Sequence, residues 1–447
     1  MRRIQNRLSE RGTQDVMKLD ERVWEMAHPL REVGDIDPLL NRIGEARCVL
    51  LGEASNGTSE YYTWRARISE RLIREKGFSF IAVEGDWPDC YEVTRYVKGY
   101  PDSGTSARKV LKTFDRWPTW MWANEEIVDL LGRLRQHNAG LSEEERVGFY
   151  GLDVYSLWES MEAVIEYLER VDPEAVPTAR RAYKCFEPYG EDVREYARAT
   201  ALVSTSCEDE VVDMLSELRG RLPEYRDDPE SRFNAEQNAL VVKDAETYYR
   251  TMVRGSSASW NVRDRHMAET LERLMSYHGP NARAIVWEHN THIGDARFTN
   301  MADAGMVNVG QLVREQRGAE DVVLVGFGSH RGGVIAGAEW GAPMERMWVP
   351  AAREGSWEDI LHRAGEEDKL LIFADTEDKH SLLEPRGHRA IGVVYEPARE
   401  RYGNYVPTVL PRRYDAFLYL DETQPLHPLY ERSGENGDPA ETFPSGA

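Results

Sequence analysis

Residues 47–60 read RCVLLGEASNGTSE, and this stretch decides the fold. A short apolar run is followed directly by a polar loop that begins with Gly52 and Glu53, and 60–76 then has the apolar spacing of an amphipathic helix. A continuous apolar run, unlike an alternating one, is typical of a strand covered by helices on both faces. The stretch therefore predicts a strand, a polar loop and a returning helix, which is the repeating unit of an α/β fold.

Other short apolar runs repeat this pattern along the chain. They lie at 78–83 (FSFIAV), 147–150 (VGFY), 284–287 (AIVW), 322–327 (VVLVGF), 370–374 (LLIFA), 391–395 (IGVVY) and 416–420 (AFLYL). A second amphipathic helix is expected at 124–137, after the run at 78–83 and a loop. The fold class is therefore α/β, with a mostly parallel central sheet flanked by helices.

A large helical insertion is expected at 156–277, where almost no strand pattern occurs. Helical periodicity covers 157–171, 173–186, 209–222, 233–253 and 258–277. We expect one catalytic domain over 1–430, in which this insertion forms a wall or cap beside the sheet. Residues 431–447 are rich in glycine, proline and acidic residues and are expected to be a flexible tail.

The charge of the chain limits its partners. Its 78 acidic and 56 basic residues give a formal charge of −22. Such a chain repels phosphate backbones and anionic membrane surfaces, so a nucleic-acid or membrane partner is not expected. The basic N-terminus lacks the apolar segment of a signal peptide, and no apolar run approaches the ~20 residues of a membrane span. These features favour a cytoplasmic protein with a small-molecule substrate.

The four cysteines carry no recognisable motif. Cys48, Cys90, Cys185 and Cys207 are widely spaced and form no CxxC pair. Each is expected to be a small buried apolar side chain rather than a metal ligand, a nucleophile or part of a disulfide framework.

Polar residues follow the predicted strands, where an open α/β sheet binds its ligands. Glu53 and Asn56 follow the first run, and Arg65 lies on the helix behind them. The other polar groups at this edge are Glu84, Asp86, Asp89, Asp153, Glu288, His289, His292, Ser329, His330 and Arg331. Acids, imidazoles and guanidinium groups at one edge are typical of an acid–base site.

Each of these residues also has an ordinary structural interpretation. Glu53 would suit a helix N-terminus, and a single histidine after a strand is commonly a structural hydrogen-bonding group. Two histidines in HNTH, facing Glu53 and Glu84, favour function instead. The chain has no GxSxG, HExxH, GxxxxGK[ST] or GxGxxG pattern, so a serine nucleophile, nucleotide binding and a cofactor have no support. Direct activation of water by an acid–base pair is the chemistry left.

Several long motifs resemble the erythromycin esterase family. They are GEASNGTSEYYTWRARISERLI at 52–73, FIAVEGDWPDCYEVTRYV at 80–97, WPTWMWANEEI at 117–127, WNVRDRHMAETL at 260–271 and VWEHNTHIGDAR at 286–297. The resemblance covers about residues 40–420. It implies a hydrolase that opens an ester or lactone, with macrolides as the model substrate, and that needs neither metal nor cofactor.

The resemblance also implies a set of catalytic residues. Glu53 and Arg65 would orient and polarise the reacting groups, Glu84 would support them, and His289 would be the second imidazole. The family's principal base is the histidine of GEASHG, and this chain has Asn56 at that position. Because asparagine is no general base at neutral pH, three explanations stand. Asn56 is an engineered inactivating change, or His289 acts as the base in a natural enzyme, or the chain binds its ligand without hydrolysis.

The expected substrate side of the site is aromatic. Trp87, Trp117, Trp120 and Trp122, with Phe114 and Tyr155, would form an apolar wall for a bulky substrate, although WPTWMW is equally compatible with the protein core. His292, Met301, Met306, His330 and Arg331 are further candidate contacts, the last two alternatively helix caps. The acidic residues of the cleft would favour a cationic group on the substrate.

Three other functions compete with ester hydrolysis. One is a tailoring enzyme of natural-product biosynthesis that acts on an ester, amide or peptide. Another is a metallohydrolase that uses Glu53, Glu84, His289 and His292 as ligands. The third is a non-catalytic binding protein.

Overall fold

In the computed structural model, which describes residues 19–189, 193–202, 206–225, 228–252, 256–373 and 380–430, the described residues form a nine-stranded sheet. Eight of its strands lie in the order β1-β8-β11-β6-β2-β5-β3-β4, and β7 pairs with β6. The strands are β1 (Ala27–Pro29), β2 (Cys48–Leu51), β3 (Phe80–Val83), β4 (Gly148–Gly151), β5 (Ala284–Trp287), β6 (Val322–Gly337), β7 (Met344–Val349), β8 (Lys369–Ile372) and β11 (Ala416–Thr423). A separate ribbon pairs β9 (Arg386–Arg389) with β10 (Tyr405–Thr408).

The prediction of a mostly parallel sheet is confirmed. The path from β11 through β6, β2, β5 and β3 to β4 is parallel throughout. Antiparallel pairing occurs between β1 and β8, between β8 and β11, and in the β6–β7 hairpin. The parallel strands thus bring their carboxyl ends to one edge, which is the edge where the polar residues were expected.

Two predictions about apolar runs were wrong. The run at 391–395 forms no regular strand. Its residues Ile391 and Tyr395 instead join a small apolar cluster with Val334. The run at 322–327 continues as β6 to Gly337. Ser329, His330 and Arg331, which were expected in a loop, therefore lie within a strand that pairs with β11.

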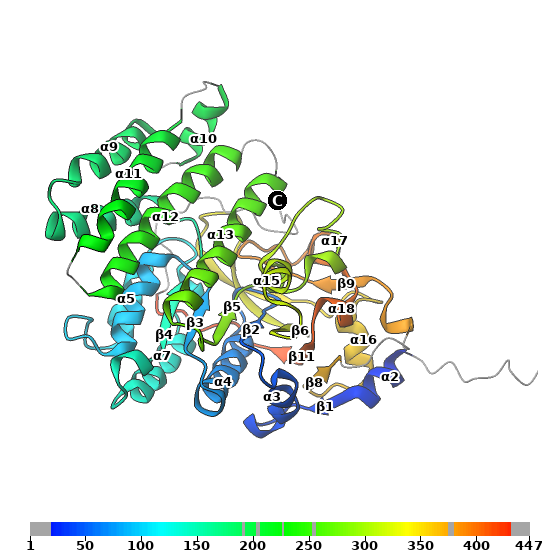
Figure 1. The fold of residues 1–447 in the computed structure, drawn as a ribbon. Helices are drawn as coiled ribbons and strands as arrows, with labels where there is room; N and C mark the ends of the chain where they lie inside the picture. The colour runs from blue at the N-terminus through cyan, green and yellow to red at the C-terminus, as the bar shows by residue number, and fades with distance from the viewer. Residues whose placement is uncertain are drawn as a thin grey trace, which may run out of the picture.

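Helices cover both faces of the sheet (Figure 1). Strand β2 shows why: Val49 and Leu51 pack on one side and Cys48 and Leu50 on the other, each side in a separate apolar core. The helices outside the insertion are α2 (Leu19–Met26), α3 (Asp37–Ile43), α4 (Ser59–Lys76), α5 (Trp87–Lys98), α6 (Ala107–Val110), α7 (Glu125–Asn138), α14 (Asn290–Ile293), α15 (Val309–Arg317), α16 (Trp357–Arg363), α17 (Glu400–Gly403) and α18 (Leu410–Arg413). Both predicted helices of this group, α4 and α7, are present.

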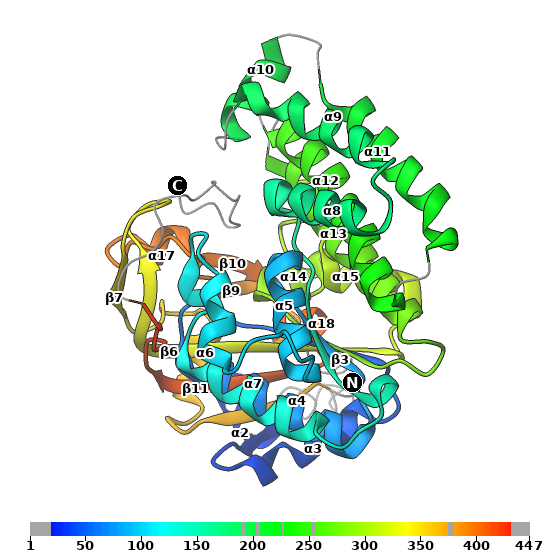
Figure 2. The same cartoon turned by 90° about the vertical axis from the view of Figure 1, so that its left-hand side faces the viewer.

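The stretch expected to be a helical insertion is helical in its described residues, and it stands to one side of the sheet (Figure 2). It holds α8 (Leu157–Val171), α9 (Val176–Phe186), α10 (Val193–Leu202), α11 (Glu208–Arg221), α12 (Pro229–Met252) and α13 (Ser256–Tyr277). Of these, α10 was not predicted. Among the described residues, no helix is both long and apolar enough to cross a bilayer. The expected tail at 431–447 lies outside the described residues.

One expectation about the cysteines was wrong. Cys185, at the end of α9, and Cys207, just before α11, form a disulfide with their Cα atoms 5.8 Å apart. The two positions are 22 residues apart in the sequence, and only the packing of α9 against α11 brings them together. Cys48 and Cys90 are buried free thiols, as expected.

Candidate active site

Glu53 and Asn56 form a hydrogen-bonded pair just beyond the end of β2. The Asn56 side-chain amide donates to Glu53 Oε1 at 3.0 Å, and Arg65 Nη2 donates to Glu53 Oε2 at 2.7 Å. Arg65 reaches back from the second turn of α4, as the sequence predicted. Gly52 lets the loop after β2 pass close to α14, because a Cβ at Gly52 would lie 2.1 Å from Asn290 Oδ1.

The Glu53 carboxyl group is poised to exchange a proton near neutral pH. Its burial and the nearby Glu84 raise its pKa, while Arg65 and Asn56 oppose the rise, and the result is a pKa of about 7. A carboxyl group with a pKa close to the working pH has the property required of a general base.

Arg65 is held between two aromatic rings. Its guanidinium carbon lies 4.4 Å from the centroid of Tyr62 and 4.7 Å from that of Trp287. The side chain is fully buried, yet among the described residues its Nε and Nη1 have no hydrogen-bond partner. Two buried N–H donors beside Glu53 are therefore unused.

On the other side of the site, Arg263 organises a network of ion pairs. From α13 it donates to both oxygens of Asp153 at 2.9 and 2.7 Å, and to Glu84 Oε1 at 2.8 Å. Burial alone would raise the pKa of Glu84, but the Arg263 guanidinium and the backbone N–H of His289 oppose the rise, and the pKa lies below its ordinary value. Glu84 is thus ionised and firmly held.

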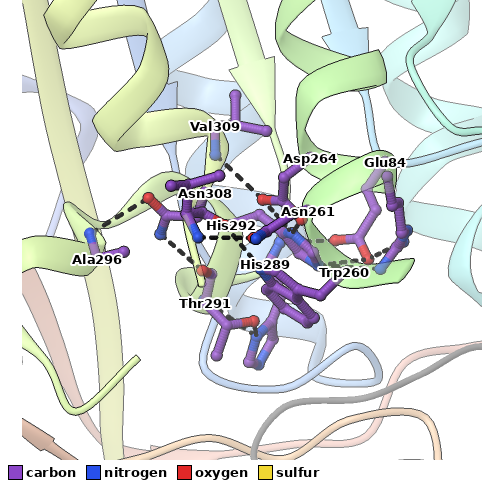
Figure 3. Close-up of polar contacts among 12 residues, drawn as sticks. Glu84, Trp260, Asn261, Asp264, His289, Thr291, His292, Ala296, Asn308 and Val309 are labelled. Carbon is purple, nitrogen blue, oxygen red and sulfur yellow. Dashed lines mark hydrogen bonds and ion pairs between the residues drawn. The ribbon is translucent and has the colours of Figure 1, made fainter. Parts of the chain in front are cut away.

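His292 is fixed by partners on both ring nitrogens (Figure 3). Its Nε2 lies 3.0 Å from Arg263 Nη1, which only donates, so Nε2 accepts and the ring proton resides on Nδ1. Nδ1 donates to Asp264 Oδ1 at 3.0 Å, and the indole of Trp260 stacks on the ring with centroids 4.5 Å apart. These contacts define an orienting role for Asp264.

His289 is the N-cap of the single-turn helix α14, which replaces the loop expected for HNTH. Its backbone N–H donates to Glu84 Oε2 at 2.8 Å. The backbone N–H of Thr291 donates to its Nδ1, so the ring proton lies on Nε2, which has no partner among the described residues. Burial lowers the pKa of His289 to about 3, which makes it a weak base.

Glu288 is a buried acid without partners. It is 1% exposed, and neither carboxyl oxygen has a hydrogen-bond partner in the described part of the chain. Burial, together with the charges of Glu84 and Asp264, raises its pKa well above the ordinary value of 4.5. Its surroundings therefore favour the protonated form.

A pocket opens onto this site. One continuous segment supplies much of its apolar wall: Phe114, Trp117, Pro118, Met121 and Trp122. The other lining residues are Asn56, Glu84, Gly85, Asp86, Asp89, Arg116, Asp153, Tyr155, Arg263, Trp340 and Val393. Four carboxyl groups and two guanidinium groups thus lie among aromatic rings.

Some of the residues expected to contact substrate lie outside the pocket lining. Trp87 is buried between Tyr150 and Phe233, and its indole N–H donates to Asn234. Trp120 is buried behind Trp117, edge to face. Regular spacing in the sequence could not distinguish these two core residues from Trp117 and Trp122, which line the pocket.

The remaining candidates also pack elsewhere. Met301 and Met306 form a small core with Trp260 behind His292. His330 stacks on His362 with centroids 3.7 Å apart, and Arg331 forms an exposed ion pair with Glu422. Because β6 continues through these last two positions, they are not presented by a loop.

Three of the four candidate metal ligands are already bonded to arginine or aspartate side chains. Glu53 is paired with Arg65, Glu84 with Arg263, and His292 with Asp264 and Arg263. Two guanidinium groups stand where a cation would have to bind. Among the described residues, no three His, Cys, Asp or Glu side chains are arranged to hold a metal ion.

A family model for erythromycin esterase matches residues 73–423. The chain belongs to the erythromycin esterase family. The match covers most of the sheet, the helical insertion and the HNTH motif, although it begins after the Glu53–Asn56 pair.

Relatives and solved structures agree with this assignment. A putative hydrolase, YbfO, of Bacillus subtilis (strain 168) is 21% identical over 85% of this chain and 84% of its own length. Erythromycin esterase type II of Escherichia coli is 20% identical over 91% of this chain and 97% of its own. These names indicate a hydrolase.

Two solved structures share the fold. A succinoglycan biosynthesis protein has a TM-score of 0.76 and 21% identity, and covers 93% of this chain and 100% of its own. A histidine-to-asparagine mutant of an erythromycin esterase, in its open conformation, has a TM-score of 0.67 and 14% identity, over 92% and 99% of the two chains.

Two site residues escaped sequence reasoning. Arg263 and Asp264 lie on α13, within the stretch interpreted as a cap, and no role was assigned to them. The motif WNVRDRHMAETL contained both and was part of the family resemblance. An arginine and an aspartate side by side on an otherwise periodic helix were the available indication.

Proposed function

We propose that this chain is an esterase that adds water to an ester or lactone of a bulky, partly apolar small molecule, and that Asn56 slows the reaction. The Glu53–Asn56 pair carries this proposal: Asn56 lines the aromatic pocket and hydrogen-bonds to a carboxyl group with a pKa of about 7. A histidine at position 56 would meet both the pocket and Glu53. It would take a proton from water while Glu53 stabilised the imidazolium.

Asn56 hydrogen-bonds to Glu53 as a histidine would, but it cannot act as a general base. Its amide nitrogen donates to Glu53 as an imidazole N–H would, yet an amide has no lone pair basic enough to deprotonate water at neutral pH. His289 is a poor substitute base, because its pKa of about 3 leaves it little affinity for a proton. This supports the interpretation that the chain as written binds its substrate well and turns it over slowly.

The test compares the unchanged chain with Asn56→His. General-base catalysis contributes about 10²–10⁴-fold, so we expect Asn56→His to hydrolyse p-nitrophenyl butyrate or a macrolactone at least about 100-fold faster. Mass spectrometry of the macrolactone should show the gain of one water. Asn56→Gln is the matched control and should stay slow. Equal rates for Asn56→His and the unchanged chain would refute the proposal.

Ligand binding without turnover is a second candidate function. It is favoured by the intact pocket and by the satisfied contacts of Asn56. Tight binding of a macrolactone by both the unchanged chain and Asn56→His, with no water added by either, would establish it. The same panel should include amide and peptide substrates, because the pocket would also admit an intermediate of natural-product biosynthesis. Cationic and neutral analogues compared at low and high salt would test the acidic lining.

A further inference from the structure

Tyr62 carries a hydroxyl group that the fold does not use. The side chain is 1% exposed, and its O–H has no acceptor among the described residues, because Arg65, the hydrogen-bonding group beside it, can only donate. A buried hydroxyl without a partner costs about 1–3 kcal/mol, and phenylalanine would fill the same space without that cost. The hydroxyl is therefore unexplained as a structural group.

Its surroundings place this hydroxyl at the candidate catalytic centre. Tyr62 and Arg65 are three residues apart on α4, so they share one face of the helix, and the tyrosine ring covers the guanidinium at 4.4 Å. The charges of Glu53 and Glu84 both act on Tyr62. Trp122, which lines the pocket, lies against Tyr62 with ring centroids 6.1 Å apart.

The unused donors of Tyr62 and Arg65 belong together. The rings of Tyr62 and Trp287 both pack on the guanidinium, with centroids 4.4 and 4.7 Å from its central carbon, and neither ring offers an acceptor oxygen to Nε or Nη1. Burial raises the pKa of Tyr62, so the phenol keeps its proton and remains a donor. Three donors therefore lie without acceptors beside Glu53 and behind the pocket wall.

We propose that the Tyr62 hydroxyl is a catalytic hydrogen-bond donor which, together with Nε and Nη1 of Arg65, stabilises the oxyanion formed during ester hydrolysis. This inference rests on the proposed function and adds a residue to it. Trp122 and Asn56 line the pocket and contact Tyr62 and Glu53, whereas Tyr62 and Arg65 are not part of the lining, so side chains of the wall must shift when the ester binds.

The reaction that the donors would serve balances as follows. Water attacks the carbonyl carbon of the ester and gives its proton to the base of the site, while the π-electron pair of the C=O bond moves onto the oxygen. That oxygen, now negative, accepts hydrogen bonds from Tyr62 and Arg65. The pair then re-forms the C=O bond, the bond to the alkoxy oxygen breaks, and that oxygen receives the proton. Donors placed at such an oxyanion act on the transition state more than on the bound ester.

The experiment introduces Tyr62→Phe into the Asn56→His chain and measures p-nitrophenyl butyrate hydrolysis and thermal unfolding. Removal of one oxyanion donor costs about 10²–10³-fold in kcat, so we expect kcat to fall about 100-fold while KM changes less than threefold. The Tm should stay the same or rise, because an unpartnered buried hydroxyl is lost. A purely structural tyrosine would not combine these two changes.

Tyr61→Phe is the matched control. Tyr61 is the adjacent buried tyrosine, and its hydroxyl donates to Ser329 at 2.9 Å, away from the pocket. Its loss should lower the Tm and leave kcat unchanged. If Tyr62→Phe left kcat within threefold of its parent, the assignment of Tyr62 would be overturned and the esterase proposal would stand.

A binding measurement covers the case in which Asn56→His hydrolyses no ester, which would refute the proposed function alone. The unchanged chain and its Tyr62→Phe variant would be titrated with benzylphosphonate, a tetrahedral oxyanion, and with benzyl acetate, a neutral ester. A tenfold or greater loss of phosphonate affinity, with unchanged affinity for the ester, is expected. Equal phosphonate affinities would overturn the inference.

Discussion

Two arginines flank the candidate site, and they are bonded very differently. Every nitrogen of the Arg263 guanidinium has an acceptor, whereas only one of the three Arg65 nitrogens has one. We call the groups around them the α13 arm (Glu84, Asp153, Arg263, Asp264 and His292) and the α4 arm (Glu53, Asn56, Tyr62 and Arg65). Glu84 in the α13 arm has a pKa of about 2, and Glu53 in the α4 arm one of about 7.

This difference distinguishes residues that support the site from residues that would take part in a reaction. Groups whose hydrogen bonds are all satisfied have nothing to offer a reacting molecule, but they fix the positions of their neighbours. Groups with unused donors and a pKa near neutrality cost stability, and such costs are typical of functional sites. We infer that the α13 arm holds the site in place, although Glu84, Asp153 and Arg263 also line the pocket, and that the α4 arm is where a substrate would react.

The largest expected effect comes from removing each arginine in turn. Arg263→Met leaves Asp153 and Glu84 buried without their partner, so we expect a loss of about 3–5 kcal/mol of unfolding free energy at pH 7. Arg65→Met should lower the unfolding free energy by less than half of that amount, because Glu53 can take up a proton when Arg65 is absent. Urea unfolding measures both. Equal losses would break the distinction between the two arms.

The pH dependence of the Arg263→Met effect follows from Glu84. The pKa of Glu84 is depressed in the folded chain, so its contribution is present above its ordinary value of 4.5 and is lost as the pH falls toward 2. The difference in stability between Arg263→Met and the unchanged chain should therefore narrow below pH 4.5. A constant difference from pH 7 to pH 3 would contradict this assignment.

The disulfide tests whether the α13 arm depends on the whole helical insertion. Cys207→Ser opens the loop between Cys185 and Cys207, and the loss for a loop of this length is about 3 kcal/mol. The arm is bonded to residues that follow β3, β4 and β5, so in the Asn56→His chain kcat and KM should not change. Reductant added to the unchanged chain should lower its Tm as much as Cys207→Ser does. A rise in KM would show that the insertion positions the arm.

Unlike the acids of the α13 arm, Glu288 has no hydrogen-bond partner among the described residues. Glu288→Gln should have the smallest effect on stability. The folded pKa of Glu288 is raised, so folding costs nothing below its ordinary pKa of 4.5, and the cost grows above it as the unfolded chain ionises. Glutamine removes that cost. Glu288→Gln should match the unchanged chain at pH 4 and exceed it in stability by about 1 kcal/mol at pH 5.5. A variant that is less stable at pH 7 would show that the carboxyl group has a partner.

Three members of the α4 arm could be predicted from sequence and Tyr62 could not, and the α13 arm could be predicted only in part. Glu53, Asn56 and Arg65 belong to one strand–loop–helix unit, so periodicity and the position after a strand place all three residues. Glu84 and His289 also follow strands. Arg263 reaches the same edge from a helix that is distant in the sequence, and only the packing of α13 on the sheet brings it there.

The wrong predictions share one cause: local patterns do not show what lies beside them. The run at 391–395 is as apolar as a strand but makes only isolated bridges, from Ile391 to Ser55 and from Val394 to Gly337 at the end of β6. His330 and Arg331 follow an apolar run, yet pairing with β11 extends β6 past them. Trp117 and Trp120 are spaced like neighbours on one surface, and one lines the pocket while the other packs behind it.

The wall that runs from Phe114 to Trp122 has a consequence for how such enzymes diversify. This one short stretch shapes the pocket, whereas the groups that would act on the ester come from other strands and helices. Exchange of this stretch between relatives would change which molecules enter while the proton-handling groups stay where they are. The residues that would shape the substrate and those that would act on it thus lie on separate pieces of the chain.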